Sequence, residues 1–235
     1  LDSADWVKEC SAWRKQYPLR YGKQGGLKAQ MVLDELDKLT RGKAIITTDV
    51  GQHQMWAAQF LRSTFNRSWI SSGGAGTMGF GFPAAIGAQL GCPDKPVWAI
   101  VGDGGFQMTL CELATAVLQK VPLKILIINN SYLGMVRQWQ ELFFDNRYSG
   151  VDMVGNPDFV KLAEAYGVKA WRIRRNGDVK RILKQAMAYN DGPCLIDAEV
   201  VKEDNVFPMV PAGAGYKDML IERPKQKMAK PTGST

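Results

Sequence analysis

The chain has 235 residues, a hydrophobic content of 46% and a formal net charge of +7 at pH 7. These values suit one large domain, or one domain with extensions, and no apolar run reaches the ~20 residues of a membrane helix. The positive residues are dispersed, apart from Arg172, Arg174, Arg175 and a basic tail. We therefore expect no nucleic-acid or membrane partner, although the charge would favour an anionic cofactor or an acidic substrate.

The cysteines are Cys10, Cys92, Cys111 and Cys194, which lie far apart without metal-ligand spacing. Because the chain has a single histidine to complement them, a zinc site is disfavoured. Cys111 falls in a helical pattern and Cys194 opens a strand, so we expect buried, reduced thiols. This favours a reducing compartment: the cytoplasm, or a plastid or mitochondrion in a eukaryote.

The chain begins at Leu1 without a signal-peptide pattern, and we expect it to be an excised portion of a longer polypeptide. Residues 1–26 are predicted to form a lead-in linker. A helical period over 27–40 is followed by the strand "AIITTDVG" (44–51) and the helix "QHQMWAAQFL" (52–61). A glycine-rich loop then leads into a helix over Pro83–Leu90, and "VWAIVGDG" (97–104) is a continuous apolar strand.

The same alternation continues through the second half. A helix is predicted over Gln107–Gln119, then the strand "LKILIINN" (123–130) and the helix "LGMVRQWQELFF" (133–144). Helices over Asp158–Tyr166 and Asp178–Tyr189 precede the strands "VKAWRI" (168–173) and "PCLIDAEV" (193–200). The pattern predicts an α/β domain over 27–201, with a doubly wound, mostly parallel sheet covered by helices on both faces. Residues 202–235 form an extension, whose last dozen residues we expect to be mobile.

Polar side chains stand at the ends of two strands that should be neighbours. Asp103 and Asn130 are 27 residues apart, which is the length of one helical crossover. Ligands of open α/β sheets bind beyond the carboxyl ends of the strands, and Mg²⁺ prefers oxygen donors that it shares with phosphates. We expect Asp103 and Asn130 to bind Mg²⁺, with a backbone carbonyl near Tyr132 as a third ligand.

The turn Gly102–Gly105 connects the first of these strands to the following helix. Its glycines would let the chain approach a phosphate closely, and the helix beyond it would direct free N–H groups there. The segment therefore predicts a diphosphate held through a metal ion. A glycine-rich turn alone would be weak evidence, but the turn combined with the strand-terminal Asn129-Asn130 is much stronger.

The GDG…NN pattern resembles the cofactor motif of thiamin diphosphate enzymes. Four longer segments resemble the carboxy-terminal third of acetohydroxyacid synthase (acetolactate synthase) catalytic subunits: "DVGQHQMWAAQF", "SSGGAGTMGFGFPAAIGAQLG", "NNSYLGMVRQWQELFF" and "NVFPMVPAGAG". The resemblance extends from about Tyr17 to Gly215. It implies the thiamin diphosphate-binding fold, with thiamin diphosphate and Mg²⁺ as cofactors.

The resemblance also assigns roles to particular residues. Met78 would lie beneath the bent cofactor, and Trp139 would line the substrate entrance and favour a larger second substrate. Without the resemblance, Met78 is a gap filler and Trp139 an ordinary core residue. The implied cofactor contacts are Gly51, Gln52, His53, Gly76, Met78, Gly102, Asp103, Gly104, Gly105, Asn130, Tyr132, Gly134 and Met135.

His53 and Ala212 lie in the segments that carry the resemblance. His53 stands at a helix start, where an isolated histidine is most often a capping or surface residue. We expect it to contact the cofactor but not to act as a general base. Ala212 falls in the segment that resembles the family's flap over the entrance, where plant enzymes often have serine.

The activity implied is the condensation of pyruvate with pyruvate or 2-oxobutyrate, giving 2-acetolactate or 2-aceto-2-hydroxybutyrate and carbon dioxide, in branched-chain amino acid biosynthesis. The family's activating glutamate lies in an amino-terminal domain supplied by a partner subunit, and FAD binds a middle domain. Neither domain has a match in these residues, so we expect the isolated chain to be inactive. The resemblance further implies a homo-oligomer (dimer or tetramer) with shared active sites and a possible regulatory small subunit.

Three alternatives stay open. Another thiamin diphosphate-dependent decarboxylase or carboligase would keep the metal motif. A non-catalytic cofactor-binding module would bind without turnover. A Rossmann nicotinamide enzyme is the third, but "GDGGF" is not GxGxxG and no ribose-binding acid stands at the required distance.

Overall fold

The computed structural model describes residues 2–22 and 24–223. Within them the chain forms a six-stranded sheet in the order β2-β1-β3-β4-β6-β5, in which every pairing is parallel. This confirms the predicted doubly wound α/β fold. The strands are β1 (Ile45–Thr48), β2 (Trp69–Ile70), β3 (Val97–Gly102), β4 (Lys124–Asn129), β5 (Lys169–Ile173) and β6 (Cys194–Glu199).

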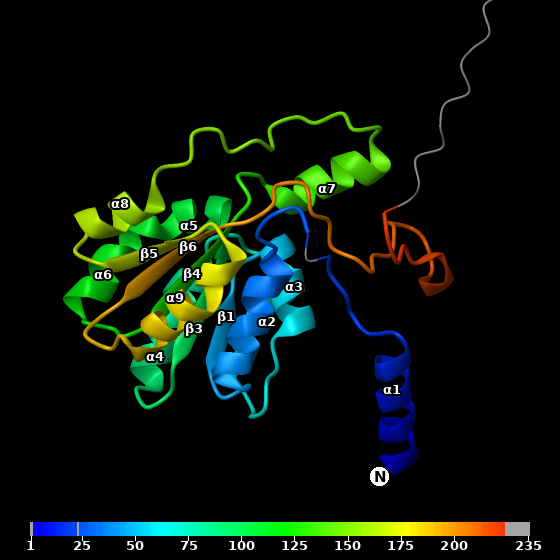
Figure 1. Cartoon of the computed structure of the whole chain (residues 1–235), viewed down its shortest axis with the longest axis horizontal. Helices are drawn as coiled ribbons and strands as arrows, with labels where there is room; N and C mark the ends of the chain where they lie inside the picture. The colour runs from blue at the N-terminus through cyan, green and yellow to red at the C-terminus, as the bar shows by residue number, and fades with distance from the viewer. Residues whose placement is uncertain (1, 23, 224–235) are drawn as a thin grey trace, which may run out of the picture.

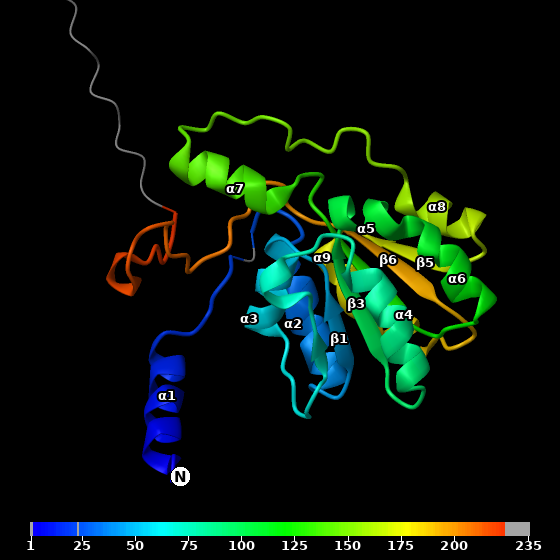
Figure 2. The ribbon, with the colours of Figure 1, turned by 180° about the vertical axis from the view of Figure 1, so that it is seen from behind.

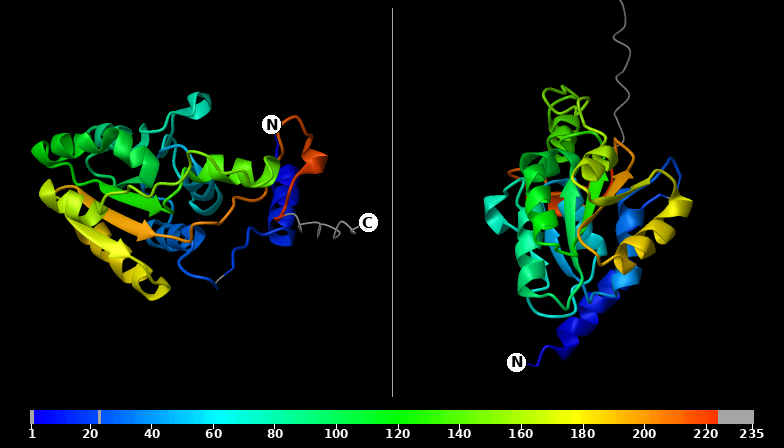
Figure 3. Two further views of the ribbon diagram at one scale, coloured as in Figure 1. Left: turned by 90° about the horizontal axis from the view of Figure 1, so that it is seen from above. Right: turned by 90° about the vertical axis from the view of Figure 1, so that its left-hand side faces the viewer.

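Helices cover both faces of the sheet, as Figures 1 and 2 show from opposite sides and Figure 3 shows edge-on. One layer contains α2 (Ala29–Thr40), α3 (Gln52–Phe60) and α9 (Asn176–Ala188). The other contains α4 (Gly81–Gly91), α5 (Asp103–Thr109), α6 (Leu113–Leu118) and α8 (Phe159–Ala165).

The continuous apolar strands are explained by this double covering. Trp98 and Ile100 of β3 face the layer with α2, α3 and α9, whereas Ala99 and Val101 face the opposite layer. Successive side chains of a strand point to opposite faces, so a sheet covered on both faces must be apolar at every position. The central strands therefore hold the site on a rigid base.

One predicted helix differs from the structure, and one strand of the structure was not predicted. The helix expected over Gln107–Gln119 begins at Asp103, so the GDGG turn forms its first turn, and a 3₁₀ turn (Leu110–Glu112) divides it into α5 and α6. The positive end of the helix dipole stabilises a carboxylate in the first turn, and Asp103 at the start of α5 fits this preference. The short strand β2 was not predicted, because its two residues become a strand only by pairing with β1.

The terminal segments extend away from the sheet. The predicted linker contains the helix α1 (Ala4–Gln16), which has no buried residue and lies apart from the sheet in Figures 1 and 2. Residues 202–223 are mostly irregular and contain a short 3₁₀ turn at Tyr216–Asp218. Another 3₁₀ turn, Gly73–Ala75, lies in the glycine-rich loop before α4. The mobility expected for the last dozen residues concerns positions outside the described ranges.

The prediction of buried cysteines is wrong for Cys10, Cys92 and Cys111, which are all exposed. Cys111 lies in the 3₁₀ turn between α5 and α6, whereas Cys194 is buried in β6 against α9. Burial raises the pKa of the Cys194 thiol to about 12. In the part of the chain that the structure describes, no helix has the length and apolar character needed to cross a membrane.

Helix α4 begins in tight contact with the end of β1. A Cβ atom at Gly81 would lie 2.5 Å from the backbone N of Asp49 and 2.8 Å from the carbonyl carbon of Thr48. We expect Gly81→Ala to lower the free energy of unfolding by about 1–3 kcal/mol, because the clash is with backbone that cannot move freely. Urea denaturation of the purified protein measures this change.

Gly87 in the same helix provides a matched control, because a Cβ there would meet nothing within 4 Å. Gly87→Ala should raise the free energy of unfolding by about 0.5–1 kcal/mol, since alanine is the better helix former. Equal effects of the two substitutions would show that helix propensity, rather than the close approach to β1, determines the result at Gly81.

Candidate functional site

A cavity of about 290 Å³ opens at the carboxyl ends of β1, β3 and β4. Strand β2 pairs with β1 on one side and β3 pairs with it on the other. The order in which successive strands are added across the sheet therefore reverses at β1. Ligands of open α/β sheets bind at such a reversal. All thirteen cofactor contacts predicted from the sequence line this cavity: Gly51, Gln52, His53, Gly76, Met78, Gly102, Asp103, Gly104, Gly105, Asn130, Tyr132, Gly134 and Met135.

Asp103 is the carboxylate of this cavity. Its side chain is buried, at 1% exposure, and Oδ2 accepts a hydrogen bond of 2.7 Å from Asn156 Nδ2. Burial is the main cause that raises the pKa of this carboxyl to about 6. A buried carboxylate whose nearest donors are neutral amides is destabilised in its charged form, and a bound cation would relieve that cost.

The two asparagines at the end of β4 have different environments. Asn129 donates from Nδ2 to Asp197 Oδ1 at 3.0 Å, toward β6, and does not line the cavity. Asn130 lines the cavity; its Nδ2 donates to Gln52 Oε1 at 3.0 Å and its Oδ1 accepts from Tyr132 N at 3.2 Å. An amide oxygen has two lone pairs, so Asn130 Oδ1 keeps one for a further partner.

His53 lies buried in the floor of the cavity. Its ring is close to the backbone of Gly51 and Gly102, and Nε2 has no hydrogen-bond partner among the described residues. Burial lowers the pKa of this imidazole to about 3. His53 therefore does not take the surface position that is usual for an isolated histidine. Its neutral ring is a poor proton acceptor at neutral pH.

Asp49, which the sequence analysis did not assign to the site, lies directly below the first turn of α5. It is fully buried, and Oδ2 stands only 1.6 Å from the position that a Cβ of Gly105 would take. Oδ1 accepts from Gly81 N at 3.4 Å. Burial raises the pKa of Asp49. The carboxyl thus connects the start of α4 to the turn below the cavity, and only glycine fits at position 105.

A chain of side-chain amides connects the cavity to the carboxy-terminal extension. Gln52 Oε1 accepts from Asn130, and its Nε2 donates to Gln138 Oε1 at 2.8 Å and to the Asp204 carbonyl at 2.9 Å. Gln138 in turn exchanges two hydrogen bonds with the backbone of Val206, of 2.7 and 2.9 Å. The oxygen and the nitrogen of the Gln52 side chain are therefore both hydrogen-bonded within the protein.

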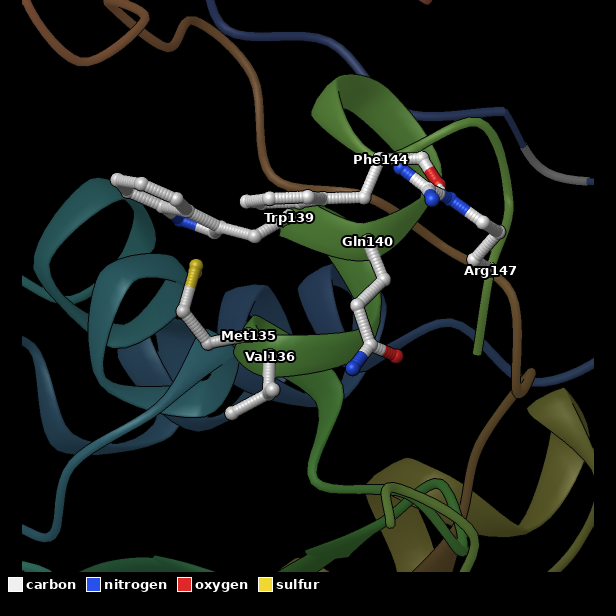
Figure 4. A pocket seen from close by; sticks show the side chains of 6 residues that line it. All are labelled: Met135, Val136, Trp139, Gln140, Phe144 and Arg147. Carbon is white, nitrogen blue, oxygen red and sulfur yellow. Dashed lines mark hydrogen bonds between the residues drawn. The ribbon is translucent and has the colours of Figure 1, made fainter. Parts of the chain in front are cut away.

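A second, apolar cavity of about 640 Å³ adjoins the first along α7 (Gly134–Phe143). Met135 and Val136 line both cavities, and Figure 4 shows the Met135 sulfur pointing toward the Trp139 indole. Trp139 is 38% exposed, so its interpretation as a core tryptophan is wrong. The remaining lining residues are Gln140, Phe144 and Arg147.

Ala212 occupies a different place from these residues. It is exposed and lines neither cavity. The extension instead contacts α7 through Val206 and through Met209, whose sulfur lies 3.5 Å from Gln138 Nε2.

Comparison with known proteins gives one family match and many relatives. The family of the C-terminal TPP-binding domain of thiamine pyrophosphate enzymes matches residues 49–198. The acetolactate synthase large subunit of Mycobacterium tuberculosis is 48% identical over 229 residues, which is 95% of this chain and 37% of that protein. The isozyme 2 large subunit of Escherichia coli is 43% identical over 94% of this chain and 40% of its own length.

A relative from the red alga Porphyra purpurea, also an acetolactate synthase large subunit, is 45% identical over 95% of this chain. The chain spans only 37–40% of the length of these curated relatives. The matches confirm the thiamin diphosphate resemblance and give no support to a nicotinamide site.

The single histidine makes the protonation state of the cavity floor directly observable. We expect the His53 ring to remain neutral between about pH 5 and pH 8, where an ordinary histidine titrates, because its pKa is lowered to about 3. Imidazole nitrogen shifts measured by NMR report this state. A midpoint close to the ordinary value would contradict the burial of the ring.

The same shift has a consequence for stability. The unfolded chain, with an ordinary histidine pKa of about 6.5, binds more protons than the folded chain at mildly acidic pH. The contribution of His53 to the free energy of unfolding therefore decreases as pH falls from about 6.5 toward about 3, by up to about 1.4 kcal/mol per unit. The difference between wild type and His53→Gln isolates this slope from that of the buried carboxyls, and a flat difference would contradict it.

Proposed function

We propose that this chain binds thiamin diphosphate through Mg²⁺ and is the cofactor-binding part of an acetolactate synthase. The chain belongs to the thiamine pyrophosphate enzymes, because it matches the family of their C-terminal TPP-binding domain. The observation that carries the cofactor proposal is the single cavity that collects Asp103, Asn130, the turn after β1 and the glycine-rich turn after β3. The choice of acetolactate synthase is supported by identities of 43–48% with those large subunits.

The donor set of the cavity fits Mg²⁺. Asp103 offers a buried carboxylate, Asn130 an amide oxygen, and the backbone carbonyl of Tyr132 is the third proposed ligand. Mg²⁺ takes hard oxygen donors and usually shares them with phosphates. Among the described residues no group of three or more His, Cys, Asp and Glu side chains is arranged for a metal, which agrees with a site that uses amide and carbonyl oxygens.

The rest of the cavity suits an anionic cofactor with an aromatic part. A Cβ at Gly104 would lie 2.7 Å from Leu133 Cδ2 and 3.7 Å from the Met78 methyl group, so apolar side chains border the Gly102–Gly105 turn. Thiamin diphosphate, when bound, would accept the electron pair released when a 2-oxo acid loses carbon dioxide. The protein residues hold its metal and phosphates, exclude water and orient its ring.

The adjoining apolar cavity is where we place the second 2-oxo acid, pyruvate or 2-oxobutyrate. Trp139 and Met135 form its wall next to the cofactor cavity. Asp103 is the only carboxylate among the described residues that line the cofactor cavity, so the activating glutamate would come from elsewhere, in our proposal from a partner subunit. We further propose a homo-oligomer with shared sites, FAD bound outside these residues, and a place in branched-chain amino acid biosynthesis.

Replacing Asp103 tests the metal assignment. We expect Asp103→Ala to weaken Mg²⁺-dependent binding of thiamin diphosphate by at least ~2 kcal/mol, the scale of a broken contact to a charged group. Titration of the cofactor with and without Mg²⁺ measures the loss. Asp94→Ala, at an exposed aspartate on the loop before β3, is the control and should bind as wild type does. Wild-type affinity in Asp103→Ala would contradict the assignment.

Replacing Trp139 tests the acceptor site. The two acceptors differ by one methylene, which an apolar wall discriminates by only ~1–3 kcal/mol. Trp139→Leu should therefore lower the preference for 2-oxobutyrate over pyruvate by roughly tenfold or more, since this contact would supply most of the discrimination. Competition between both acceptors in one reaction of the complete enzyme gives the ratio. The rate with pyruvate alone should fall much less, and an unchanged ratio would remove Trp139 from the acceptor site.

A further inference from the structure

The loop between α7 and α8 returns to the cofactor cavity and lies along the segment that follows β4. Leu133 N donates to the Val151 carbonyl at 2.8 Å, and Met153 N donates to the Ser131 carbonyl at 3.0 Å. Tyr132 and Asp152 form an antiparallel bridge between these two hydrogen bonds. Residues 151–156 are therefore fixed against the segment that carries the proposed Tyr132 ligand.

Asn156 at the end of this loop reaches the proposed metal ligand. Its Nδ2 donates to Asp103 Oδ2 at 2.7 Å. Its Oδ1 accepts from Gln107 Nε2 at 2.8 Å, and its backbone N donates to the Met153 carbonyl at 3.0 Å. The Asn156 side chain is held at both ends, so its amide has one orientation toward Asp103.

The same amide is connected to the interior of the sheet. Asn156 Nδ2 lies 3.5 Å from Asn129 Oδ1, and Asn129 donates to Asp197, which also accepts from Arg172 at 3.2 Å. These contacts extend from the loop through β4 and β6 to β5. Rotation of the Asp103 carboxylate would therefore break a hydrogen bond that is supported by fixed neighbours on both sides.

We propose that Asn156 is a positioning residue for the metal: it occupies Asp103 Oδ2 and thereby directs Oδ1 toward the cation. This inference rests on the proposed function, because it assumes that Asp103 binds Mg²⁺. A ligand carboxylate that is free to rotate must lose that freedom when it binds a metal, whereas one already held by an amide binds without this loss. The sequence shows Asn156 only as the residue before Pro157, where an asparagine indicates an ordinary turn.

The test measures the affinity for Mg²⁺ of the purified protein at saturating thiamin diphosphate, by quenching of tryptophan fluorescence. We expect Asn156→Ala to weaken this affinity by about 10–100-fold, the usual effect of removing a partner of a metal ligand. Gln107→Leu, which frees the other end of the Asn156 amide, should weaken it less, by about 3–10-fold, because Asn156 remains. Ser149→Ala, at an exposed position in the same loop, should leave the affinity unchanged.

A double substitution separates positioning from a general structural effect. If Asn156 acts through Asp103, adding Asn156→Ala to Asp103→Ala should change the Mg²⁺ affinity by less than about twofold, whereas independent effects would multiply. The melting temperature of the metal-free protein provides the check on folding. If Asn156→Ala does not fold, Gln107→Leu alone and Gln107→Leu combined with Asp103→Ala decide the question.

The outcomes distinguish the two proposals. If wild type shows no Mg²⁺-dependent binding of the cofactor, the proposed function fails and the inference fails with it. If wild type binds but Asn156→Ala and Gln107→Leu keep its affinity, only the positioning role is overturned. Additive effects in the Asp103→Ala background, or a loss of affinity matched by a lower melting temperature without metal, would likewise assign Asn156 to the general structure of the loop.

Discussion

The buried carboxylate of Asp103 is the constraint on which the site depends. It stands at the end of a central strand, where two helical layers exclude water, and its described partners are neutral amides. Such a group is costly in its charged form unless a cation joins it. In the proposed site, the surrounding glycines and the amide oxygen of Asn130 would complement a metal ion and its phosphate ligand around this carboxylate.

The sheet and most of its helices could be predicted from hydrophobic period alone, because strands covered on both faces are apolar at every position. Val97–Gly102 and Lys124–Asn129 are such strands. The two-residue strand β2 could not be predicted, since it has no period of its own and exists only beside β1. The exposed helix α1 was likewise missed, because its scattered aromatic residues indicate no buried face.

Asp103 and Asn130 could be predicted because they follow strands whose order fixes where their ends meet, whereas other cofactor contacts such as Met78 were implied only by the family resemblance. The structure then adds partners from distant parts of the chain. Asn156 lies 53 residues after Asp103 in an irregular loop, and no spacing rule connects them. Asp49 is placed by the close contact of α4 with β1, which depends on three-dimensional packing around Gly81 and Gly105. Sequence patterns locate strand ends well and give no information on which loop returns to them.

The amide chain from Asn130 through Gln52 and Gln138 to Val206 has a property that ion pairs lack. Nearby, the extension is also held by the salt bridge of Lys28 with Asp204, whose strength depends on ionic strength. Primary amides do not titrate in the physiological range and carry no net charge to screen. Salt therefore screens the Lys28–Asp204 pair, whereas the amide hydrogen bonds between the cavity and the carboxy-terminal extension contain no charged group to screen.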